Sequence, residues 1–405
     1  MKVLLVGSGG REHALAWKLA QSPDLTELHA APGNPGIAAL GRCHPVRAED
    51  GEGLLGLAGE LDAGLVVIGP EGPLVAGVAD ELRHAGFVVF GPGAAAARIE
   101  GSKLFAKEVM RAAGVPTAEV LDEPRTPCVI KADGLAAGKG VFICRTEEEL
   151  QAGLRAAAAL GAETVAEELL EGEETSLFAL ASGTDALPLP AARDYSRVGD
   201  DDIGPNTGGM GSFSPVPRLG ETEAAELVDT IHRPVLEELS RRGTPFVGVL
   251  YAGLMLTDDG PRVLEFNARF GDPETQVILP RLAGDLLPAL AAAGRGELDD
   301  VELEAGEESA VTVALTAPDY PLQGDSGTPI EGIEDAEASG ALVFHAGTAL
   351  RDGRLVTNGG RILNVTALGA DLADARERAY AAVEKISFAG MRYRTDIAAL
   401  VGIDG

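Results

Sequence analysis

The segment "EFNARFGDPETQ", residues 265–276, carries the residue types best suited to bind a metal ion and a phosphate. It follows an apolar stretch that predicts a strand, and Glu265 and Asn267 are separated by one residue, so their side chains leave the same face. A carboxylate and an amide oxygen are hard ligands of the kind that Mg²⁺ prefers, with phosphate and water in the other positions. We expect Arg269 on the same face and Asp272 in the following turn. Four polar groups beside an apolar strand indicate a binding site.

A second segment, "KADGLAAGKG", residues 131–140, places two lysines in a loop of small residues between two predicted strands. The ammonium groups of Lys131 and Lys139 can both form ion pairs with phosphate. The loop lacks the GxxxxGK[ST] spacing of a P-loop, so a nucleotide is implied without that motif. We expect the loop to cover the phosphates during a reaction and to open between turnovers.

Glycine-rich segments suggest a second binding region. "GSGGREH" follows the first predicted strand, but Glu12 occupies the last position of a GxGxxG fingerprint, which excludes a nicotinamide dehydrogenase. This segment has two interpretations. It is a tight structural turn, or it is a binding site for a phosphate or a sugar, in which Gly10 and Arg11 would supply hydrogen-bond donors at a helix N-terminus. Glu71 follows another strand of the same predicted sheet and should lie in the same crevice. Four glycines within 201–215 predict a substrate-binding loop.

These segments fall in three predicted regions of an α/β protein. In residues 1–100, continuous apolar strands alternate with helices, which is typical of a doubly wound parallel sheet. Residues 101–325 contain a small two-layer lid, at about 115–185, and then long strands. Residues 326–405 are mostly β.

Composition limits the partners and the location. The net charge of −30 and the 4% aromatic content argue against nucleic acid. No apolar run approaches the ~20 residues of a membrane span. Three cysteines without metal or redox spacing favour free thiols in a reducing compartment, and the N-terminus does not read as a signal peptide. We therefore expect a cytoplasmic enzyme acting on small molecules, as a monomer or small homo-oligomer. No histidine spacing suggests catalytic zinc.

Together the motifs resemble the ATP-grasp superfamily and, more closely, the glycinamide ribonucleotide synthetase family. The match runs in order through "GSGGREHALAWK", "APGNPG", "GPEGPLVAG", "IKADGLAAGKGV", "RVGDDDIGPNTGGMG", "EFNARFGDPETQ" and "VTNGGRIL". The resemblance implies a nucleotide-fold N-domain, an ATP-grasp region with its lid, and a β-rich C-terminal domain. It also implies an ATP-dependent ligase of purine biosynthesis, with Mg²⁺ or Mn²⁺. This ligase would join glycine to 5-phosphoribosylamine through glycyl phosphate.

The resemblance also implies roles for matching residues. Nucleotide contacts would come from Lys103, Lys131, Asp133, Gly138, the hinge residues Glu167, Glu168, Leu169 and Leu170, and Glu173 or Glu174 on the ribose. The metal would be held by Glu265 and Asn267. The substrate-binding site would comprise Gly10, Arg11, Glu71, Asp194, Asn206, Thr207, Gly208, Gly209 and Arg361. Catalysis would involve Lys139, Arg269 and Asp272, although no dedicated general base is evident and Asp272 is only a candidate.

Two departures from the family pattern stand out. Many ATP-grasp proteins carry another metal carboxylate on the strand before Glu-x-Asn, and "GVLYAGLML" has none. Ser196 stands where relatives often have a lysine, which leaves a substrate role for that position in doubt. Two alternatives stay open: an ATP-grasp relative that transfers formyl or carboxy groups, and a nucleotide-binding protein without catalysis. "PNTGGMG" and "FGDPETQ" favour the glycine ligase.

Overall fold

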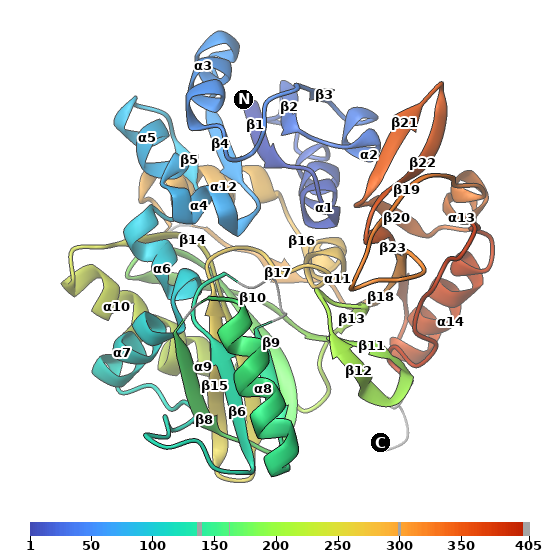
Figure 1. Cartoon of the computed structure of the whole chain (residues 1–405). Helices are drawn as coiled ribbons and strands as arrows, with labels where there is room; N and C mark the ends of the chain where they lie inside the picture. Colours follow the sequence, from blue (N-terminus) through green and yellow to red (C-terminus); the bar gives the residue numbers. More distant parts are fainter. Residues whose placement is uncertain (136–139, 162, 299–300, 400–405) are drawn as a thin grey trace.

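The computed structural model describes residues 1–135, 140–161, 163–298 and 301–399 (Figure 1). It confirms an α/β protein with an N-terminal parallel sheet, a central ATP-grasp-like region and C-terminal antiparallel sheets. In the part of the chain described, no helix combines the length and apolar character that a bilayer crossing requires.

The N-terminal region is a five-stranded parallel sheet in the order β3-β2-β1-β4-β5. In β1, Leu4 and Val6 belong to one apolar core while Val3 and Leu5 belong to another, so helices cover both faces of the sheet. The elements are β1 (Lys2–Gly7), α1 (Gly10–Leu19), β2 (Glu27–Pro32), α2 (Pro35–Ala38), β3 (Arg42–Cys43), α3 (Gly51–Leu61), β4 (Leu65–Ile68), α4 (Glu71–Ala76), α5 (Val78–His84) and β5 (Val89–Phe90).

Two helices lead from this region into a small lid, which comprises the antiparallel sheet β7-β6-β8 and one helix packed against it. Its core is small and includes Cys128 and Cys144, which face each other across β6 and β7 as free thiols. The elements are α6 (Ala94–Gly101), α7 (Lys103–Ala113), β6 (Cys128–Ala132), β7 (Val141–Cys144), α8 (Glu147–Ala159) and β8 (Thr164–Glu168).

An eight-stranded sheet, in the order β15-β14-β9-β10-β13-β18-β23-β20, runs from the ATP-grasp region into the C-terminal region. Its central elements are β9 (Glu173–Gly183), β10 (Asp185–Asp194), β11 (Arg197–Gly199), a 3₁₀ turn (Asp200–Asp202), β12 (Ile203–Asn206), β13 (Gly211–Ser214), α9 (Glu221–Leu227), a π-helical turn (Val228–His232), α10 (Arg233–Arg241), β14 (Phe246–Thr257), β15 (Gly260–Asn267), α11 (Thr275–Arg281), β16 (Leu282–Ala283), α12 (Leu286–Arg295), β17 (Glu304–Ala305) and β18 (Ser309–Thr316).

The C-terminal region adds a three-stranded sheet, β19-β22-β21, and packs α14 on β18 and β23 around a separate core. Its elements are β19 (Asp325–Pro329), α13 (Ile333–Ala338), β20 (Leu342–His345), β21 (Thr348–Arg351), β22 (Arg354–Gly359), β23 (Arg361–Gly369) and α14 (Leu372–Val383). Because β18 pairs with both β13 and β23, the two regions share one hydrogen-bonded sheet.

Strand register places several polar residues of the eight-stranded sheet on one face. Tyr251 of β14 lies opposite Asn267 of β15, and its neighbour two residues on, Gly253, lies opposite Glu265. Gly253 also lies opposite Ser176 of β9. Directly opposed residues of antiparallel strands share a face, so these five positions share one. We call it the site face.

Candidate active site

The predicted metal pair lies at the end of β15. Glu265 and Asn267 leave the same face, as the one-residue spacing predicted, with Asn267 Nδ2 3.4 Å from Glu265 Oε1. Gly253 on the neighbouring strand leaves the space beside Glu265 without a side chain. Within the described residues, no group of three or more histidine, cysteine or acidic side chains could hold a metal. Glu265 and Asn267 thus offer two hard oxygen ligands. Such a pair suits Mg²⁺, which usually takes its other ligands from phosphate and water.

Arg269 follows the metal pair and is held in place by carboxylates from the N-terminal half of the chain. Its Nη2 contacts Glu100 Oε1 at 2.8 Å and Asn267 Oδ1 at 3.2 Å, and its Nε lies 3.2 Å from Glu71 Oε2. Burial disfavours the guanidinium charge, but Glu100 and Glu71 outweigh it and hold the pKa of Arg269 above its ordinary value. Burial also opposes ionisation of Glu71, yet Arg269 and Arg11 lower the pKa of Glu71 to about 2. This corner is therefore a fixed array of charges.

The nucleotide side of the site contains a buried charged triad. Glu167 Oε2 lies 2.8 Å from Lys131 Nζ, and its Oε1 lies 3.1 Å from Lys107 Nζ. Lys131 also donates to the Leu264 carbonyl at 2.9 Å. All three charged side chains are at most 7% exposed. The Glu167 side chain, which the hinge interpretation left without a role, thus holds Lys131 in position.

Asp133 and Lys103 form the junction between the lid and α7. The Asp133 carboxylate accepts hydrogen bonds from the backbone N–H of Lys103 and from the Ser102 hydroxyl, so it caps the N-terminus of α7. Lys103 Nζ donates to the Gly134 carbonyl at 3.0 Å. The structure therefore places Asp133 where it orients Lys103. Lys139 and Gly138 lie outside the described residues.

The two candidate ribose glutamates lie on opposite faces of β9. Glu173 forms an ion pair with Arg193, whereas Glu174 alternates with Ser176 and lies on the site face. Burial, followed by the charges of Asp202 and Glu265, raises the pKa of Glu174. The other hinge residues, Glu168, Leu169 and Leu170, connect β8 to β9, and Glu168 pairs with Arg262 at 2.9 Å.

A cleft lies between these groups; we call it the nucleotide cleft. One part of its wall is apolar and suits a flat base, while the other part is charged and suits phosphates. It is lined by Glu71, Ile99, Glu100, Lys103, Ala106, Lys107, Met110, Lys131, Gly134, Leu135, Gly140, Val141, Glu167, Leu264, Glu265, Phe266, Asn267 and Arg269.

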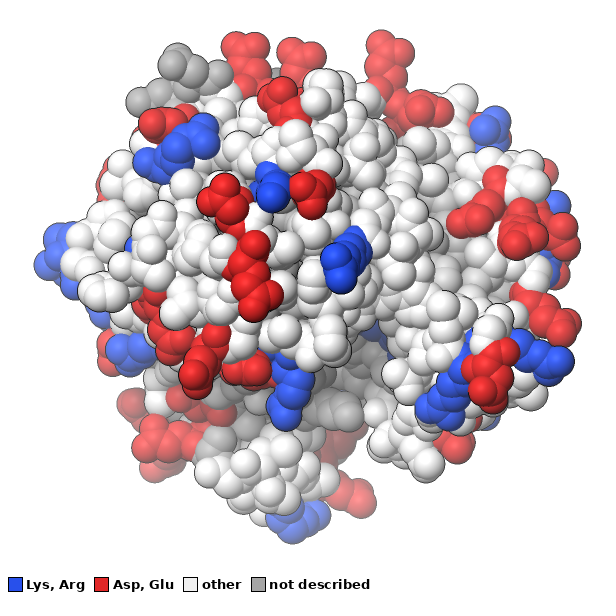
Figure 2. All heavy atoms as spheres, turned by 90° about the horizontal axis from the view of Figure 1, so that it is seen from above, with Lys and Arg blue, Asp and Glu red and all other residues white. Residues whose placement is uncertain are grey.

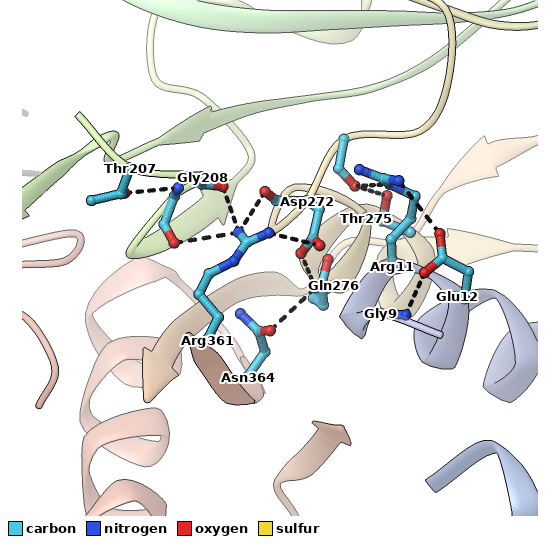
Figure 3. A network of polar contacts seen from close by, with 12 residues as sticks. Gly9, Arg11, Glu12, Thr207, Gly208, Asp272, Thr275, Gln276, Arg361 and Asn364 are labelled. Carbon is cyan, nitrogen blue, oxygen red and sulfur yellow. Dashed lines mark hydrogen bonds and ion pairs between the residues drawn. The ribbon is translucent and has the colours of Figure 1, made fainter. Parts of the chain in front are cut away.

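Figure 3 shows the glycine turn before α1 and the side chains that hold it. Glu12 Oε2 accepts a hydrogen bond from the backbone N–H of Gly9 at 2.6 Å, so the residue that breaks the fingerprint closes the turn. Arg11 donates to the carbonyls of Gly69 and Gly271, at 3.0 and 3.4 Å, and lies 3.9 Å from Glu71. The turn is structural, and it also brings Arg11 and Glu71 to one crevice, as expected.

Arg361 connects the C-terminal region to the ATP-grasp region (Figure 3). Its Nη2 lies 2.8 Å from Asp272 Oδ2, and its Nη1 donates to the carbonyls of Asp272, Gly208 and Gly209. Asp272 Oδ1 accepts from Gln276 Nε2 at 2.7 Å. The guanidinium predicted to bind substrate phosphate thus holds the loop and the turn that contains Asp272.

The loop after β12 packs tightly against that turn. Thr207 Oγ1 donates to the Ser196 carbonyl at 2.9 Å, and Gly208 N–H donates to Tyr320 Oη at 2.9 Å. Gly209 has φ +109°, and a Cβ there would lie 2.3 Å from Pro273, so only glycine fits. Asn206 ends β12 opposite Arg197, and Asp194 ends β10. The 208–209 loop, the Asp272–Pro273 turn and Arg361 are thus in direct contact.

Several residues of this site escaped the sequence analysis. Lys107 is one helical turn after Lys103, and this i,i+4 spacing could have indicated it. Glu100, Glu274 and Gln276 had no comparable signal, because their partners come from distant parts of the chain. Figure 2 shows a face of the molecule on which acidic side chains are interspersed with fewer basic ones, in keeping with the net charge of −30.

Comparisons with known proteins agree with this geometry. Three family models match: the phosphoribosylglycinamide synthetase N domain over residues 1–100, its ATP-grasp (A) domain over 101–275 and its C domain over 310–400. The phosphoribosylamine–glycine ligase of Streptomyces coelicolor is 51% identical over 415 residues, covering 98% of this chain and 99% of that protein.

Solved structures point the same way. A crystal structure of phosphoribosylamine–glycine ligase from Thermotoga maritima superimposes with a TM-score of 0.85 at 35% identity, over 98% of this chain and 100% of that one. The biotin carboxylase domain of 2-oxoglutarate carboxylase from Hydrogenobacter thermophilus, solved with MgADP, shares the fold at TM-score 0.72 and 19% identity, over 96% of this chain and 91% of that one. The chain therefore belongs to the phosphoribosylglycinamide synthetase family of ATP-grasp enzymes.

Proposed function

We propose that the nucleotide cleft binds ATP with Mg²⁺ and that the adjoining crevice holds glycine and 5-phosphoribosylamine. The chain is an ATP-dependent ligase that joins glycine to phosphoribosylamine in purine biosynthesis, through a glycyl phosphate intermediate. The site assignment rests on one observation. Glu265, Asn267 and Arg269 lie beside buried lysines on one side and beside Glu71 and its neighbour Arg11 on the other.

In this proposal, Lys103 and Lys131 contact the phosphates of ATP, and the hinge at 167–170 receives the adenine. Glu174 takes the ribose hydroxyls, because it lies on the site face while Glu173 is paired away from it. Glu265 and Asn267 hold the metal, which when bound neutralises phosphate charge and aligns the γ-phosphate. Glu167 and Asp133 act by holding Lys131 and Lys103 in place.

The first step is attack of the glycine carboxylate on the γ-phosphorus, which yields glycyl phosphate and ADP. Charge builds on the transferring oxygens, and Arg269 and the lysines provide fixed positive charge beside them without reorganising. In the second step the neutral amine of phosphoribosylamine attacks the acyl carbon, and phosphate leaves. The acyl phosphate would react with water, so the lid must exclude solvent between the steps.

On the substrate side, we propose that Gly10, Arg11 and Glu71 bind phosphoribosylamine, and that the loop at 206–209 and Asp194 complete the crevice. Arg361 and Asp272 shape it by holding that loop against α11. The three cysteines are free thiols, which supports a cytoplasmic location.

The test measures ADP formation with ATP and Mg²⁺ while glycine and phosphoribosylamine are omitted in turn. We expect full turnover only with both, and mass spectrometry should identify glycinamide ribonucleotide. ADP formation with formate or bicarbonate in place of glycine, and none with glycine, would overturn the assignment in favour of a different ATP-grasp reaction.

A further inference from the structure

Amide formation releases a proton, and the two steps described above do not say which residue accepts it. The attacking amine becomes a cationic nitrogen when the C–N bond forms, and it must lose one proton as phosphate leaves with the C–O electron pair. Asp272, the candidate base from the sequence, has one carboxylate oxygen on Arg361 and the other on Gln276. The proton acceptor must therefore lie elsewhere in the crevice.

Two other carboxyl groups, those of Asp194 and Glu274, are connected to the site face. Ala192 of β10 lies opposite Ser176, so Asp194, two residues on, has its side chain on the same face as Glu265. Asp194 is half-buried at the end of β10, and its carboxylate accepts from Ser196 Oγ at 2.7 Å. Its carboxyl group is therefore held on the face that carries the predicted metal pair.

Glu274 reaches the same place from the opposite side. It precedes α11, is 3% exposed, and its Oε1 accepts from Tyr251 Oη at 2.7 Å. Tyr251 Oη also lies 2.9 Å from Ser176 Oγ. A chain of hydroxyl groups therefore connects the buried glutamate to the part of the site face beside Asp194.

We propose that Asp194 contacts the amine and accepts its proton during C–N bond formation, while Glu274 is a second carboxyl group hydrogen-bonded to this face through the Tyr251 hydroxyl. The proton leaves nitrogen as the acyl C–O bond breaks, and it passes from Asp194 to the departing phosphate, so the products are the amide and hydrogen phosphate. This inference rests on the proposed function of the site.

The proton affinities of the two groups suit this role. Burial is the main cause that raises the pKa of Asp194, to about 6, and burial together with the negative charge of Asp194 raises the pKa of Glu274 to about 7. A general base works best when its pKa lies near the working pH. The charged and titratable groups around the pair are Glu174 from β9, Tyr251 from β14, Glu265 from β15, Arg269 from the loop after β15, and Arg361 from β23.

The first experiment separates the two chemical steps. Hydroxylamine, a nucleophile that is already neutral at pH 7, traps glycyl phosphate as glycine hydroxamate without a base. We expect Asp194→Asn to form hydroxamate from glycine and ATP within about threefold of the wild-type rate. Amide formation with phosphoribosylamine should fall by roughly 10²-fold or more, the usual contribution of a positioned base. Asp185→Asn, at the other end of β10, is the matched control and should change neither rate.

The second experiment measures how kcat for amide formation depends on pH. In the wild type, kcat should rise as Asp194 ionises, near pH 6, and Asp194→Asn should remove this rise. Because the pKa of Glu274 lies above that of Asp194, Glu274 still holds its proton over the rise, and Glu274→Gln, which keeps an acceptor for Tyr251, should leave the rise in place. Hydroxamate formation by this variant shows that it is folded.

The outcomes are distinct. If Asp194→Asn loses both reactions equally, or loses neither, or if kcat of Asp194→Asn still rises near pH 6, the proton-acceptor role is wrong. If the wild type forms no hydroxamate from glycine and ATP, the proposed function itself fails, whatever the variants do.

Discussion

Replacement of Glu167 by glutamine tests whether buried charge holds the nucleotide cleft together. The carboxylate lies between two ammonium groups, at 2.8 Å from Lys131 and 3.1 Å from Lys107, and all three side chains are at most 7% exposed. Removing one partner of a buried pair costs about 3–5 kcal/mol, because the other charge is left without compensation. Glutamine keeps the shape and one acceptor, so we expect about 3 kcal/mol.

For a region of this size, that loss corresponds to a melting temperature lower by about 6–12 °C. The matched control is Glu168→Gln, because Glu168 is the next residue and forms an ion pair with Arg262 at 2.9 Å but is 34% exposed. A surface pair of this kind contributes about 0–1 kcal/mol, so the control should melt within about 4 °C of the wild type.

ATP binding gives the second readout for the same pair of variants. Without its carboxylate partner, Lys131 loses its fixed position, and we expect the Kd for ATP, measured by calorimetry, to rise about tenfold in Glu167→Gln, which corresponds to about 1.4 kcal/mol. If both variants melt and bind ATP alike, the triad has no special role and the reasoning from buried charge is refuted.

Three further changes test other parts of the molecule. Glu265→Gln should fold normally but lose roughly 10²-fold in kcat, because one metal ligand loses its charge; an active variant with unchanged magnesium dependence would contradict the metal assignment. Arg361→Ala should raise the KM for phosphoribosylamine and leave that for ATP nearly unchanged, because it frees the Asp272 turn and the 208–209 loop; a rise in the ATP KM alone would count against this. His13 is buried against His345, and burial lowers the pKa of His13 to about 3, so folding keeps it neutral and its stabilising effect is complete above pH 6.5 and lost as pH falls toward 3. The stability of His13→Gln, followed by thermal melting, should therefore fall less steeply than that of the wild type between pH 6.5 and 4, and equal slopes would show that His13 does not titrate in that range.

Sequence periodicity predicted those features that depend on one element at a time. Residues 1–100 form the alternating strands and helices that were expected, and the apolar strand β1 is buried on both faces, so it needs no polar alternation. The spacing of Glu265 and Asn267 predicted their common face for the same reason, since alternation along a strand is a local property.

The features that escaped prediction depend on contacts between distant segments. Because Tyr251 lies in an apolar strand, its sequence context predicts a core residue. In the structure, its hydroxyl donates a hydrogen bond to Glu274, which precedes α11. The family resemblance implied a nucleotide contact for Asp133, but nothing in the sequence indicated that its carboxylate also caps a helix that begins thirty residues earlier. Local sequence does not say which distant backbone group a carboxylate will meet.

The hydrogen bonds already made by the arginines indicate which of them can still receive a substrate phosphate. Arg361 has Asp272 on one terminal nitrogen and three carbonyl groups on the other. Arg11 uses its Nε and Nη1, while its Nη2 makes no hydrogen bond among the residues described. A guanidinium has five N–H donors, and a phosphate gains most from those that need not first give up a partner. Direct phosphate contact therefore favours Arg11 at the start of α1, and Arg361 contributes by fixing the wall of the crevice opposite it.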